Sequence, residues 1–509
     1  MYNHWFVSRQ KRQLTQILPA LIAFNDICVG KVWSGNTALQ IEYEDVLQER
    51  DISSHGSLRA RRTGQGGGGI RTLFTQLKDL GLIFAEDETK VCRLTLIGEA
   101  IVKAEISFVD AMRLQLSRYQ YPSATRLSGA GAVSEDFKVH PFIFLLRLLR
   151  DERLDSVLTM DEMTYIVIHK AKSDSTACLE SIIKDILTLR ITKTMPSDAP
   201  EDPKKTFSNI ANTFFNYLSL TQYIDRGNTC IIVRKGKESE IDKLIDAPAK
   251  FIKFPEQPEI YQRNFGRGVS AKDLRDFSKV SKASKTEINE ARIKSEYALL
   301  KLKMPITMID GEVVDIISSK TGIDERFVER FLRKTFPRGS VDDFFLTYKE
   351  YALGGRAFAT EFELATVEVF KRIFGMTAKH VGLLKNAPDV FVESDSEKCC
   401  GIIDNKAYEK GYSIIGDHKR RMTDEYIPNV ARYGSARYPL AFFSYISSDF
   451  SSSINAQIKE IHDLTGVDGS AMPVDLMIDF AQDYASKGYT HKDIKRIFSA
   501  GKEITLSDI

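Results

Sequence analysis

The chain has 509 residues, with 71 lysines and arginines against 69 aspartates and glutamates and a formal net charge of +2. Because a compact domain usually holds roughly 100–200 residues, this length predicts about three or four domains. A charge so close to zero excludes a protein that binds nucleic acid through bulk positive charge alone, but a local basic face is still compatible with it. Residues 1–150 carry 19 basic and 15 acidic groups, so the modest basic excess lies in the front part of the chain.

The apolar runs and the cysteines indicate where the protein works. The longest runs, such as residues 142–146, fall far short of the roughly 20 residues of a membrane-spanning helix. Residues 1–12 are not followed by the apolar stretch and cleavage site of a signal peptide. The six cysteines include no CxxC pair, which is typical of a reducing compartment and speaks against structural zinc. We therefore expect a cytoplasmic protein.

Two stretches in the first 250 residues repeat one pattern, a helix followed by two short strands. The expected helix and strands are residues 70–80, 82–84 and 91–96 in the first stretch and residues 213–220, 222–224 and 230–233 in the second. Gly81 ends the first of these helices. The order is typical of winged helices that bind DNA, and the alternative is a helical scaffold or oligomerisation domain. We expect DNA-recognition subdomains at residues 1–130 and 131–250.

The rest of the chain divides into a helical part and an α/β part. Prolines at 248, 255 and 258 mark a boundary, and we expect a helical linker or adaptor over residues 251–343. Residues 344–509 are expected to form a mixed α/β domain. Its expected helices are residues 359–374, 416–427 and 454–464, and its expected strands are residues 389–393, 400–406 and 440–447. The fold class predicted is thus multidomain, with a mostly α recognition region of winged-helix-like units.

Two aspartates and a lysine in the last domain carry its chemistry. Asp389 opens one expected strand, and the next strand carries Asp404 and Lys406. Because successive side chains of a strand point to opposite faces, Asp404 and Lys406 point the same way. A turn between the strands would bring Asp389 beside them.

Two carboxylates that meet on one face repel each other unless a cation neutralises them, and such hard oxygen ligands suit Mg²⁺. Lys406 can hold the attacking water or stabilise charge that develops on a phosphate. The set serves metal-assisted phosphodiester hydrolysis, with Asp389 and Asp404 as metal ligands. Glu368, on the expected helix 359–374, could add a ligand or position water. The alternative is chance, because the PD…DxK pattern is short, but its place on two strands behind a glutamate-bearing helix argues against chance.

Seven short segments of the last domain carry a resemblance to a known family, in the same order along the chain: residues 367–370, 379–382, 388–389, 403–408, 411–412, 456–458 and 497–501. Through them, residues 360–504 resemble the cleavage domain of the FokI restriction endonuclease. The resemblance implies a PD-(D/E)xK nuclease fold whose catalytic positions are Asp389, Asp404 and Lys406.

Five segments of the front half carry a second resemblance: residues 5–8, 71–83, 94–100, 119–123 and 141–146. They resemble the AlwI family of type IIS restriction and nicking endonucleases. Together the two resemblances imply a Mg²⁺-dependent enzyme that binds a short asymmetric site in double-stranded DNA and cuts a short distance outside it. A cognate DNA methyltransferase would be its functional partner in restriction–modification.

The FokI resemblance also implies a transient homodimer through a helix that follows the catalytic strands. If Met422 marks that helix, the charges of Arg420 and Asp424 stand in reversed order relative to the FokI family. They could serve a two-fold contact or form an intrahelical ion pair. Other functions remain open: a strand-specific nicking endonuclease, the large subunit of a heterodimeric enzyme, or a winged-helix DNA-binding regulator with an inactive nuclease fold.

The glycine-rich residues 64–69 lack the Lys-Ser/Thr of a nucleotide-binding loop. We expect instead a basic arm that contacts DNA phosphates, and the alternative is a solvated loop. The candidate DNA-binding residues in and around this arm are Arg59, Arg61, Arg62, Arg71 and Lys78.

Overall fold

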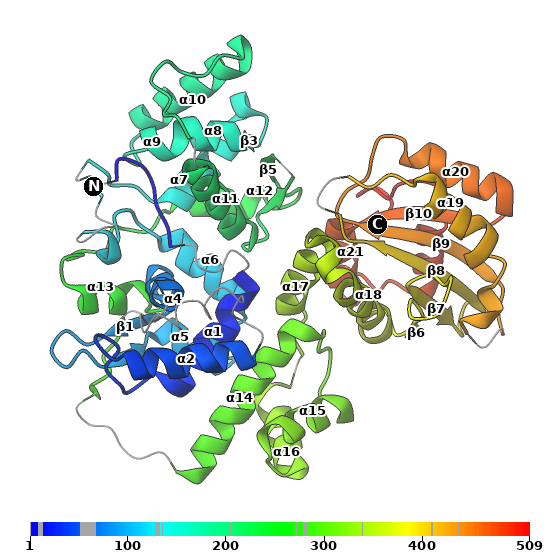
Figure 1. Cartoon of the computed structure of the whole chain (residues 1–509), viewed down its shortest axis with the longest axis horizontal. Coiled ribbons are helices and arrows are strands. Elements are labelled where there is room, and N and C mark those ends of the chain that lie inside the picture. Colours follow the sequence, from blue (N-terminus) through cyan, green and yellow to red (C-terminus); the bar gives the residue numbers. More distant parts are fainter. Residues whose placement is uncertain are drawn as a thin grey trace. The chain divides into compact units, whose positions relative to one another are not determined.

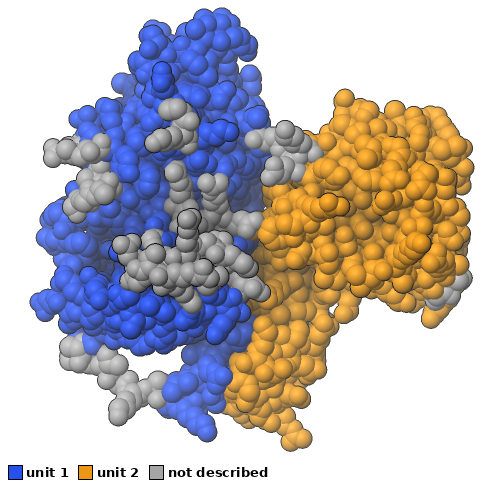
Figure 2. All heavy atoms as spheres, in the orientation of Figure 1, with its two compact units in different colours: residues 1–298 blue, residues 299–509 orange. Residues whose placement is uncertain are grey.

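The computed structural model divides the chain into two compact units, Met1–Ala298 and Leu299–Ile509 (Figure 2). The residues that it describes are 2–8, 14–50, 68–127, 133–134, 136–202, 205–227, 229–270, 272–277, 284–337, 339–408, 411–434 and 437–509. The first unit is mainly helical, and the second contains an α/β domain built on a central sheet (Figure 1). This confirms the coarse part of the predicted fold class, and the division into four parts stays a prediction.

The front part of the first unit packs helices around one small hairpin. Its elements are η1 (Leu14–Gln16), α1 (Ile17–Ile27), α2 (Thr37–Glu49), α4 (Gly68–Asp79), β1 (Ile83–Ala85), β2 (Cys92–Leu94), α5 (Leu96–Val102) and α6 (Phe108–Arg118). The expected strand 91–96 was too long. The side chain of Thr95 accepts a hydrogen bond from the backbone of Gly98 at 3.1 Å and so caps α5, which stops the strand at Leu94.

A buried ion pair lies at the end of α4. Asp79 pairs with Arg126, and both side chains are almost fully buried, at 0% and 5% exposure. The Asp79 carboxylate also accepts hydrogen bonds from the backbone of Ser8, at 3.1 Å, and from the hydroxyl of Thr125. The Arg126 guanidinium lies over the ring of Phe6, 4.6 Å from its centroid. Segments far apart in the sequence are therefore held together by one charged pair.

The second half of the first unit adds a three-stranded antiparallel sheet in the order β3-β5-β4. Its elements are α7 (Pro141–Leu149), β3 (Val157–Thr159), α8 (Met160–Glu162), η6 (Met163–Val167), α9 (Ile168–Lys170), α10 (Thr176–Thr192), α11 (Thr206–Ser219), β4 (Ile224–Arg226), β5 (Cys230–Val233), α12 (Glu238–Asp246) and α13 (Pro258–Phe265). The expected strand 222–224 was wrong, because the backbone amides of Thr221 and Gln222 close a turn onto α11. The strand begins only at Ile224.

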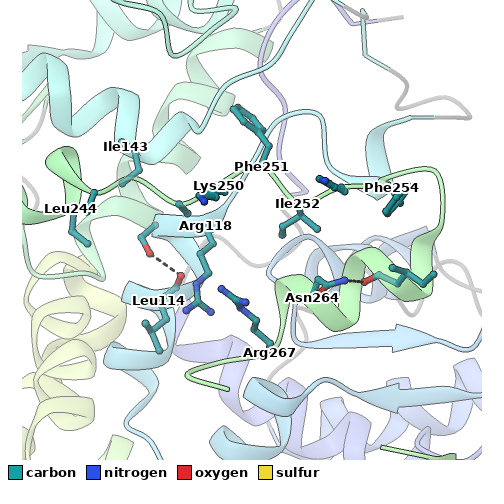
Figure 3. A pocket seen from close by; sticks show the side chains of 15 residues that line it. Leu114, Arg118, Ile143, Leu244, Lys250, Phe251, Ile252, Phe254, Asn264 and Arg267 are labelled. Carbon is teal, nitrogen blue, oxygen red and sulfur yellow. Dashed lines mark hydrogen bonds between the residues drawn. The ribbon is translucent and has the colours of Figure 1, made fainter. Parts of the chain in front are cut away.

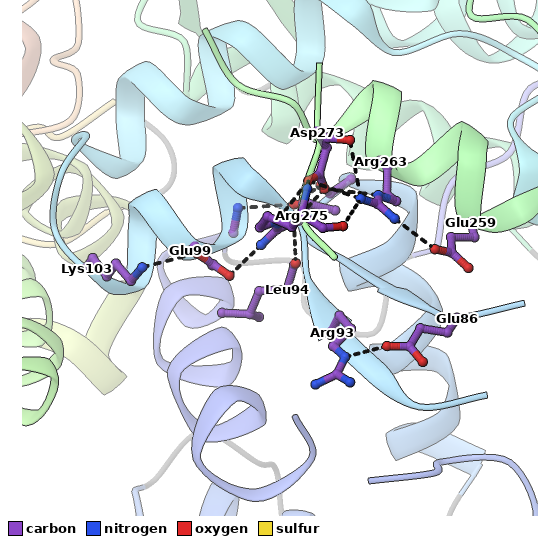
Figure 4. Close-up of polar contacts among 12 residues, drawn as sticks. Glu86, Arg93, Leu94, Glu99, Lys103, Glu259, Arg263, Asp273 and Arg275 are labelled. Atoms are coloured by element: carbon purple, nitrogen blue, oxygen red, sulfur yellow. Dashed lines mark hydrogen bonds and ion pairs between the residues drawn. The ribbon is translucent and has the colours of Figure 1, made fainter. Parts of the chain in front are cut away.

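A segment that follows α13 is tied onto the β1–β2 hairpin by charged side chains (Figure 4). Arg275 pairs with Glu99 of α5 and donates to the backbone carbonyl of Leu94 at 3.0 Å. It also pairs with Asp273 at 2.7 Å, and Arg263 of α13 donates to the carbonyl of Arg275 at 2.7 Å. This part of the expected linker is therefore packed into the first unit.

The second unit opens with helices. They are the end of α14 (Lys285–Lys303), α15 (Gly311–Thr321), α16 (Glu325–Thr335), α17 (Asp342–Leu353), η8 (Gly355–Phe358), α18 (Ala359–Glu368) and the π-helical turn η9 (Val369–Ile373). These helices agree with the helical character expected up to residue 343. Asp310 caps α15 by accepting from the backbone of Val313 at 2.9 Å, and Gly322 ends that helix with φ +68°.

A five-stranded mixed sheet forms the centre of the second unit, in the order β10-β9-β8-β7-β6. The strands are β6 (Thr377–His380), β7 (Val390–Ser394), β8 (Cys399–Lys406), β9 (Leu440–Ser447) and β10 (Asp468–Pro473); the other elements are α19 (Gly416–Arg420), η10 (Arg421–Tyr426), η11 (Val430–Arg432), α20 (Ile454–Thr465), α21 (Val474–Asp483) and α22 (His491–Phe498). β8 pairs antiparallel with β7 and parallel with β9. The three strands expected here are confirmed.

Both faces of this sheet are covered by helices (Figure 1). Ile403 of β8 packs into one core with side chains of α17, α18, α21 and α22, whereas Ile402 packs into the other with side chains of η10 and α20. Gly401 lies so close to the Phe442 ring that a Cβ would come within 2.2 Å of it, so only glycine fits there. Among the described residues, no helix combines the length and the apolar character of a membrane span.

Candidate active site

β7 and β8 bring the three predicted residues together. Val390 pairs with Ile403, so Asp389, one residue earlier, stands opposite Asp404. The Asp389 carboxylate accepts a hydrogen bond from the backbone of Asn405 at 2.6 Å. Lys406 Nζ lies 2.6 Å from Asp404 Oδ2. The predicted placement of the two aspartates and the lysine on one side of the strands is therefore confirmed, and their catalytic roles stay a prediction.

Burial and like charge set the protonation of this group. Burial raises the pKa of Asp389 well above its usual value, and the negative charge of Asp404 raises it further. Burial acts to lower the pKa of Lys406, but the attraction of Asp404 and Asp389 outweighs it, so this pKa lies above its usual value. The lysine therefore stays charged and neutralises only one of its two carboxylate neighbours.

Glu363 and His380 stand beside these carboxylates, and Glu363 was overlooked in the sequence. Glu363 Oε2 on α18 lies 2.7 Å from His380 Nε2 on β6, and the charge of Glu363 helps to raise the pKa of Asp389. A Cβ on Gly382 would lie 3.1 Å from both side chains and 3.5 Å from the Cα of Asp389, which places the pair next to that aspartate. Glu363 is three residues before Thr366 and so shares its face of α18, but only the fold shows that this face is buried.

Glu368, the acidic residue that the sequence singled out on this helix, belongs to another network. Its carboxylate lies 2.7 Å from Arg372. Arg372 also pairs with Asp310 at 2.9 Å and with Glu312 at 2.6 Å, both near the start of α15. The structure thus brings Glu363, rather than Glu368, to the two aspartates.

Aromatic side chains lie near the ammonium of Lys406. Its ammonium lies 6.0 Å from the ring centroid of Tyr412, whose hydroxyl is 2.8 Å from His418 Nδ1. Burial and the charge of Asp404 raise the pKa of Tyr426 to about 12. Burial and the positive charge of Lys406 lower the pKa of His418. These groups are therefore neutral near pH 7, and the charge of the site is concentrated on the carboxylates and Lys406.

The donor set fits a hard divalent cation. Asp389, Asp404 and Glu363 bring three carboxyl groups together beside the single ammonium of Lys406, and carboxylate oxygens are the ligands that Mg²⁺ prefers. Within the described ranges, no group of three or more His, Cys, Asp or Glu side chains has the arrangement of a complete metal site. Mg²⁺ usually takes only one or two carboxylates and completes its shell with water and phosphate oxygens. Two aspartates that face each other on neighbouring strands match this preference.

The other predicted residues have different outcomes. Arg59, Arg61 and Arg62 lie outside the described residues. Arg71 is exposed on α4. Lys78, on the same helix, is half-buried with its ammonium 5.7 Å from the ring centroid of Phe74, and burial lowers its pKa. DNA contact by these residues stays a prediction.

The charges considered for dimerisation are engaged locally. Arg420 pairs with Asp417 at 3.1 Å and with Glu425 at 2.5 Å. The carboxylate of Asp424 accepts from the hydroxyl of Thr423 at 2.7 Å. All these groups lie on the surface of α19 and η10, so a contact through them stays a prediction.

Replacing Asp389 by asparagine is expected to stabilise the protein without metal at neutral pH. An unfolded aspartate ionises near pH 3.9, whereas the folded pKa of Asp389 is higher. Below the unfolded pKa, Asp389 is protonated in both states and does not lower the free energy of unfolding. As the pH rises from the unfolded to the folded pKa, the unfolded state loses this proton more readily, so the free energy of unfolding falls. We expect the unfolding temperature of the second unit to rise by about 2–4 °C at neutral pH, for about 1 kcal/mol. Calorimetry in EDTA measures the unfolding temperature. An equal rise at about pH 4 would show that the raised pKa of Asp389 is not the cause.

Two families of known proteins match two successive parts of the chain. Residues 78–310 match the family described as AlwI restriction endonuclease, and residues 322–505 match the family described as FokI, cleavage domain. The type II restriction enzyme StsI of Streptococcus sanguinis is 25% identical over 147 residues, which are 27% of this chain and 24% of StsI. The matched part therefore spans about a quarter of that relative.

Three solved structures are similar at low identity. The restriction endonuclease FokI has a TM-score of 0.30 at 14% identity over 98% of this chain and 99% of FokI. FokI bound to DNA has a TM-score of 0.29 at 12% identity over 98% and 93%. The BpuJ1 endonuclease binding domain, in complex with pyrene- and phenanthrene-modified DNA, has a TM-score of 0.37 at 15% identity over 52% and 96%. The chain is thus similar to the AlwI restriction endonuclease family over residues 78–310 and to the FokI cleavage domain over residues 322–505, as its motifs predicted.

Proposed function

We propose that the protein is a type IIS restriction endonuclease that binds a short asymmetric site in double-stranded DNA and hydrolyses phosphodiester bonds outside it. One observation carries the proposal: Asp389, Asp404 and Lys406 stand together on adjacent strands within the region that matches the FokI cleavage domain. Carboxylates beside a charged lysine are the groups that metal-assisted phosphodiester hydrolysis requires. An inactive nuclease fold would have no need to keep them.

Each residue then has a separate task in the reaction. Asp389 and Asp404 would hold Mg²⁺, which supplies a Lewis acid for the phosphate and an acidified water. Lys406, charged and 2.6 Å from Asp404, would stabilise the negative charge that develops on the phosphate. Glu363, paired with His380, would fix the surroundings of Asp389 and could accept a hydrogen bond from the attacking water.

Recognition belongs to the first unit in this proposal. A nuclease that contacts mainly the DNA backbone cannot distinguish sequences, so base-edge contacts must come from another part of the chain. The two helix-and-hairpin stretches, which end in β1–β2 and in β4–β5, would act as winged-helix-like units. The helical region between recognition and cleavage would set the distance between the site and the cut.

Two partners follow from the same proposal. A second copy of the chain could supply the second nuclease domain for a double-strand cut, through the surface of α19 and η10 that carries Arg420 and Asp424. A cognate DNA methyltransferase would protect the host sequence. If pairing is needed, the rate of double-strand cutting per enzyme molecule should rise with enzyme concentration.

A plasmid assay tests the proposed activity. Supercoiled plasmid incubated with the full chain and Mg²⁺ should become linear, and EDTA should prevent this. Conversion to open circles alone would favour the nicking endonuclease, which remains the second candidate because the AlwI resemblance includes nicking enzymes. Binding without any cutting in Mg²⁺ would instead favour a DNA-binding regulator.

A further inference from the structure

A cavity in the first unit has the lining of an anion site. It measures about 670 Å³ and lies between α6, α12, α13 and the segment that joins α12 to α13 (Figure 3). Its charged lining residues are all basic: Arg118, Lys250, Lys253 and Arg267. None of the described residues that line it is acidic. In a chain with a net charge of only +2, such a local excess of positive charge is a specific feature of this surface.

The two arginines face each other inside this cavity. Figure 3 shows the guanidinium groups of Arg118, from α6, and of Arg267, which follows α13, side by side. Burial lowers the pKa of Arg118, and the positive charge of Arg267 lowers it further. Arg118 donates to the backbone carbonyl of Gly268, and no carboxylate of the described residues is among the groups that shift its pKa. Holding two like charges close together in a partly buried site costs free energy unless an anion joins them.

Arg118 differs in this respect from other arginines of the same unit. Arg150 pairs with Asp242 at 2.7 Å, and Arg153 pairs with Asp151 and Glu180, each at 2.8 Å. These carboxylates neutralise their guanidinium groups, so such arginines offer little attraction to a further anion. The contrast indicates that the charge of Arg118 is kept for a ligand from outside the chain.

Apart from Ser117 and Asn264, the uncharged lining residues are apolar, and some of them are exposed. Phe254 is 52% exposed and Ile260 is 44% exposed. Phe251 is held in place, because its ring centroid lies 4.1 Å from that of His140, with the rings tilted by 37°, and 5.3 Å from the ammonium of Lys138. Paired guanidinium groups beside apolar side chains match a phosphate that carries a sugar better than they match a free inorganic anion.

We propose that this cavity binds a sugar–phosphate unit of the DNA backbone. Arg118 and Arg267 donate to the phosphate oxygens, Phe254 and Ile260 contact the sugar, and the exposed lysines at 250 and 253 attract the neighbouring phosphate. Arginine suits this task because its planar fork donates two parallel hydrogen bonds to a phosphate. The inference rests on the proposed function, since it takes DNA as the ligand, and it assigns to the cavity the positioning of the recognition unit on the duplex.

The salt dependence of DNA binding tests the assignment. The full chain with Asp404→Ala, which prevents cutting, is titrated onto a short duplex that carries the sequence found next to the cut ends. Each lost phosphate contact should make the slope of log K against log salt less negative by about 0.9. We expect that change for Arg267→Ala and a comparable one for the pair Lys250→Ala and Lys253→Ala, which are exposed and leave the fold intact. Arg267→Lys keeps the charge and should restore most of the slope.

The control is Arg153→Ala, which removes an arginine of the same unit that carboxylates already neutralise. Its slope should equal that of the parent. If the Arg267→Ala protein and the double lysine variant both keep the parent slope and affinity, the cavity is not a phosphate site, even though the parent binds DNA. A parent that binds no duplex at any salt concentration overturns the proposed function and this inference with it.

Discussion

Replacing Asp404 by alanine is expected to abolish DNA cleavage while site-specific DNA binding persists. The change removes one of the two carboxylates that would hold Mg²⁺ and leaves Lys406 without its partner at 2.6 Å. Loss of a group that stabilises transition-state charge usually costs about 10²–10³-fold in rate, and loss of a metal ligand adds to this. We therefore expect the rate of plasmid linearisation to fall by at least about 10³-fold. Binding should be unchanged, because the proposed function assigns recognition to the first unit and Asp404 lies in the second.

A matched control comes from the turn between the same two strands. Asp395 follows β7 and is 70% exposed at the surface, so Asp395→Ala removes an aspartate near the site without touching Asp389 or Lys406. Its cleavage rate should stay within a factor of about two of the unaltered protein. Mg²⁺-dependent cutting that survives in Asp404→Ala would refute the assignment of the active site.

Replacing Asp79 by alanine is expected to unfold much of the first unit. The change leaves the guanidinium of Arg126, 5% exposed, as a charge without its carboxylate in the protein interior. Breaking a buried ion pair in this way costs about 3–5 kcal/mol, a large share of the stability of a typical domain. It also removes the acceptor for Ser8 and Thr125, so the N-terminal segment loses its attachment to α4. Chemical denaturation followed by tryptophan fluorescence of Trp5 and Trp33 measures the loss.

Two further variants separate charge burial from a general effect of substitution. Asp26→Ala breaks a partly exposed pair with Arg50, 3.0 Å apart, and should cost less than about 1 kcal/mol. The combination of Asp79→Leu with Arg126→Met removes both buried charges and should cost less than Asp79→Ala alone. A double variant at least as unstable as the single one would show that the charges themselves are not the cause.

The sequence predicted the centre of the nuclease fold because local patterns dominate there. The strands around Ile402 and Phe443 are apolar on both faces, as expected when helices cover a sheet on both sides, and their bounds were close to those observed. The alternation of side chains along one strand was enough to place Asp404 beside Lys406. The edge strands were missed, since β6 reads Thr-Ala-Lys-His and β10 reads Asp-Gly-Ser-Ala-Met-Pro, neither with an apolar pattern.

The remaining parts of the site depend on contacts between distant segments. Choosing Glu363 over Glu368 requires the rotation of α18 against the sheet, which the hydrogen bond from Asn405 to Thr366 at 2.7 Å shows and which helical spacing alone does not. The basic cavity joins Arg118 to Arg267, about 150 residues later, and no local motif links them. Tertiary packing decides such pairs, so single-sequence patterns could not predict them.

In the proposed function, one part of the chain recognises DNA and another part cuts it at a distance. Sequencing the ends of plasmid fragments produced by the full chain in Mg²⁺ tests it most directly. We expect the ends to share one short asymmetric sequence and every cut to lie at the same offset outside that sequence. Cuts inside a symmetric site, or ends that share no sequence, would contradict it.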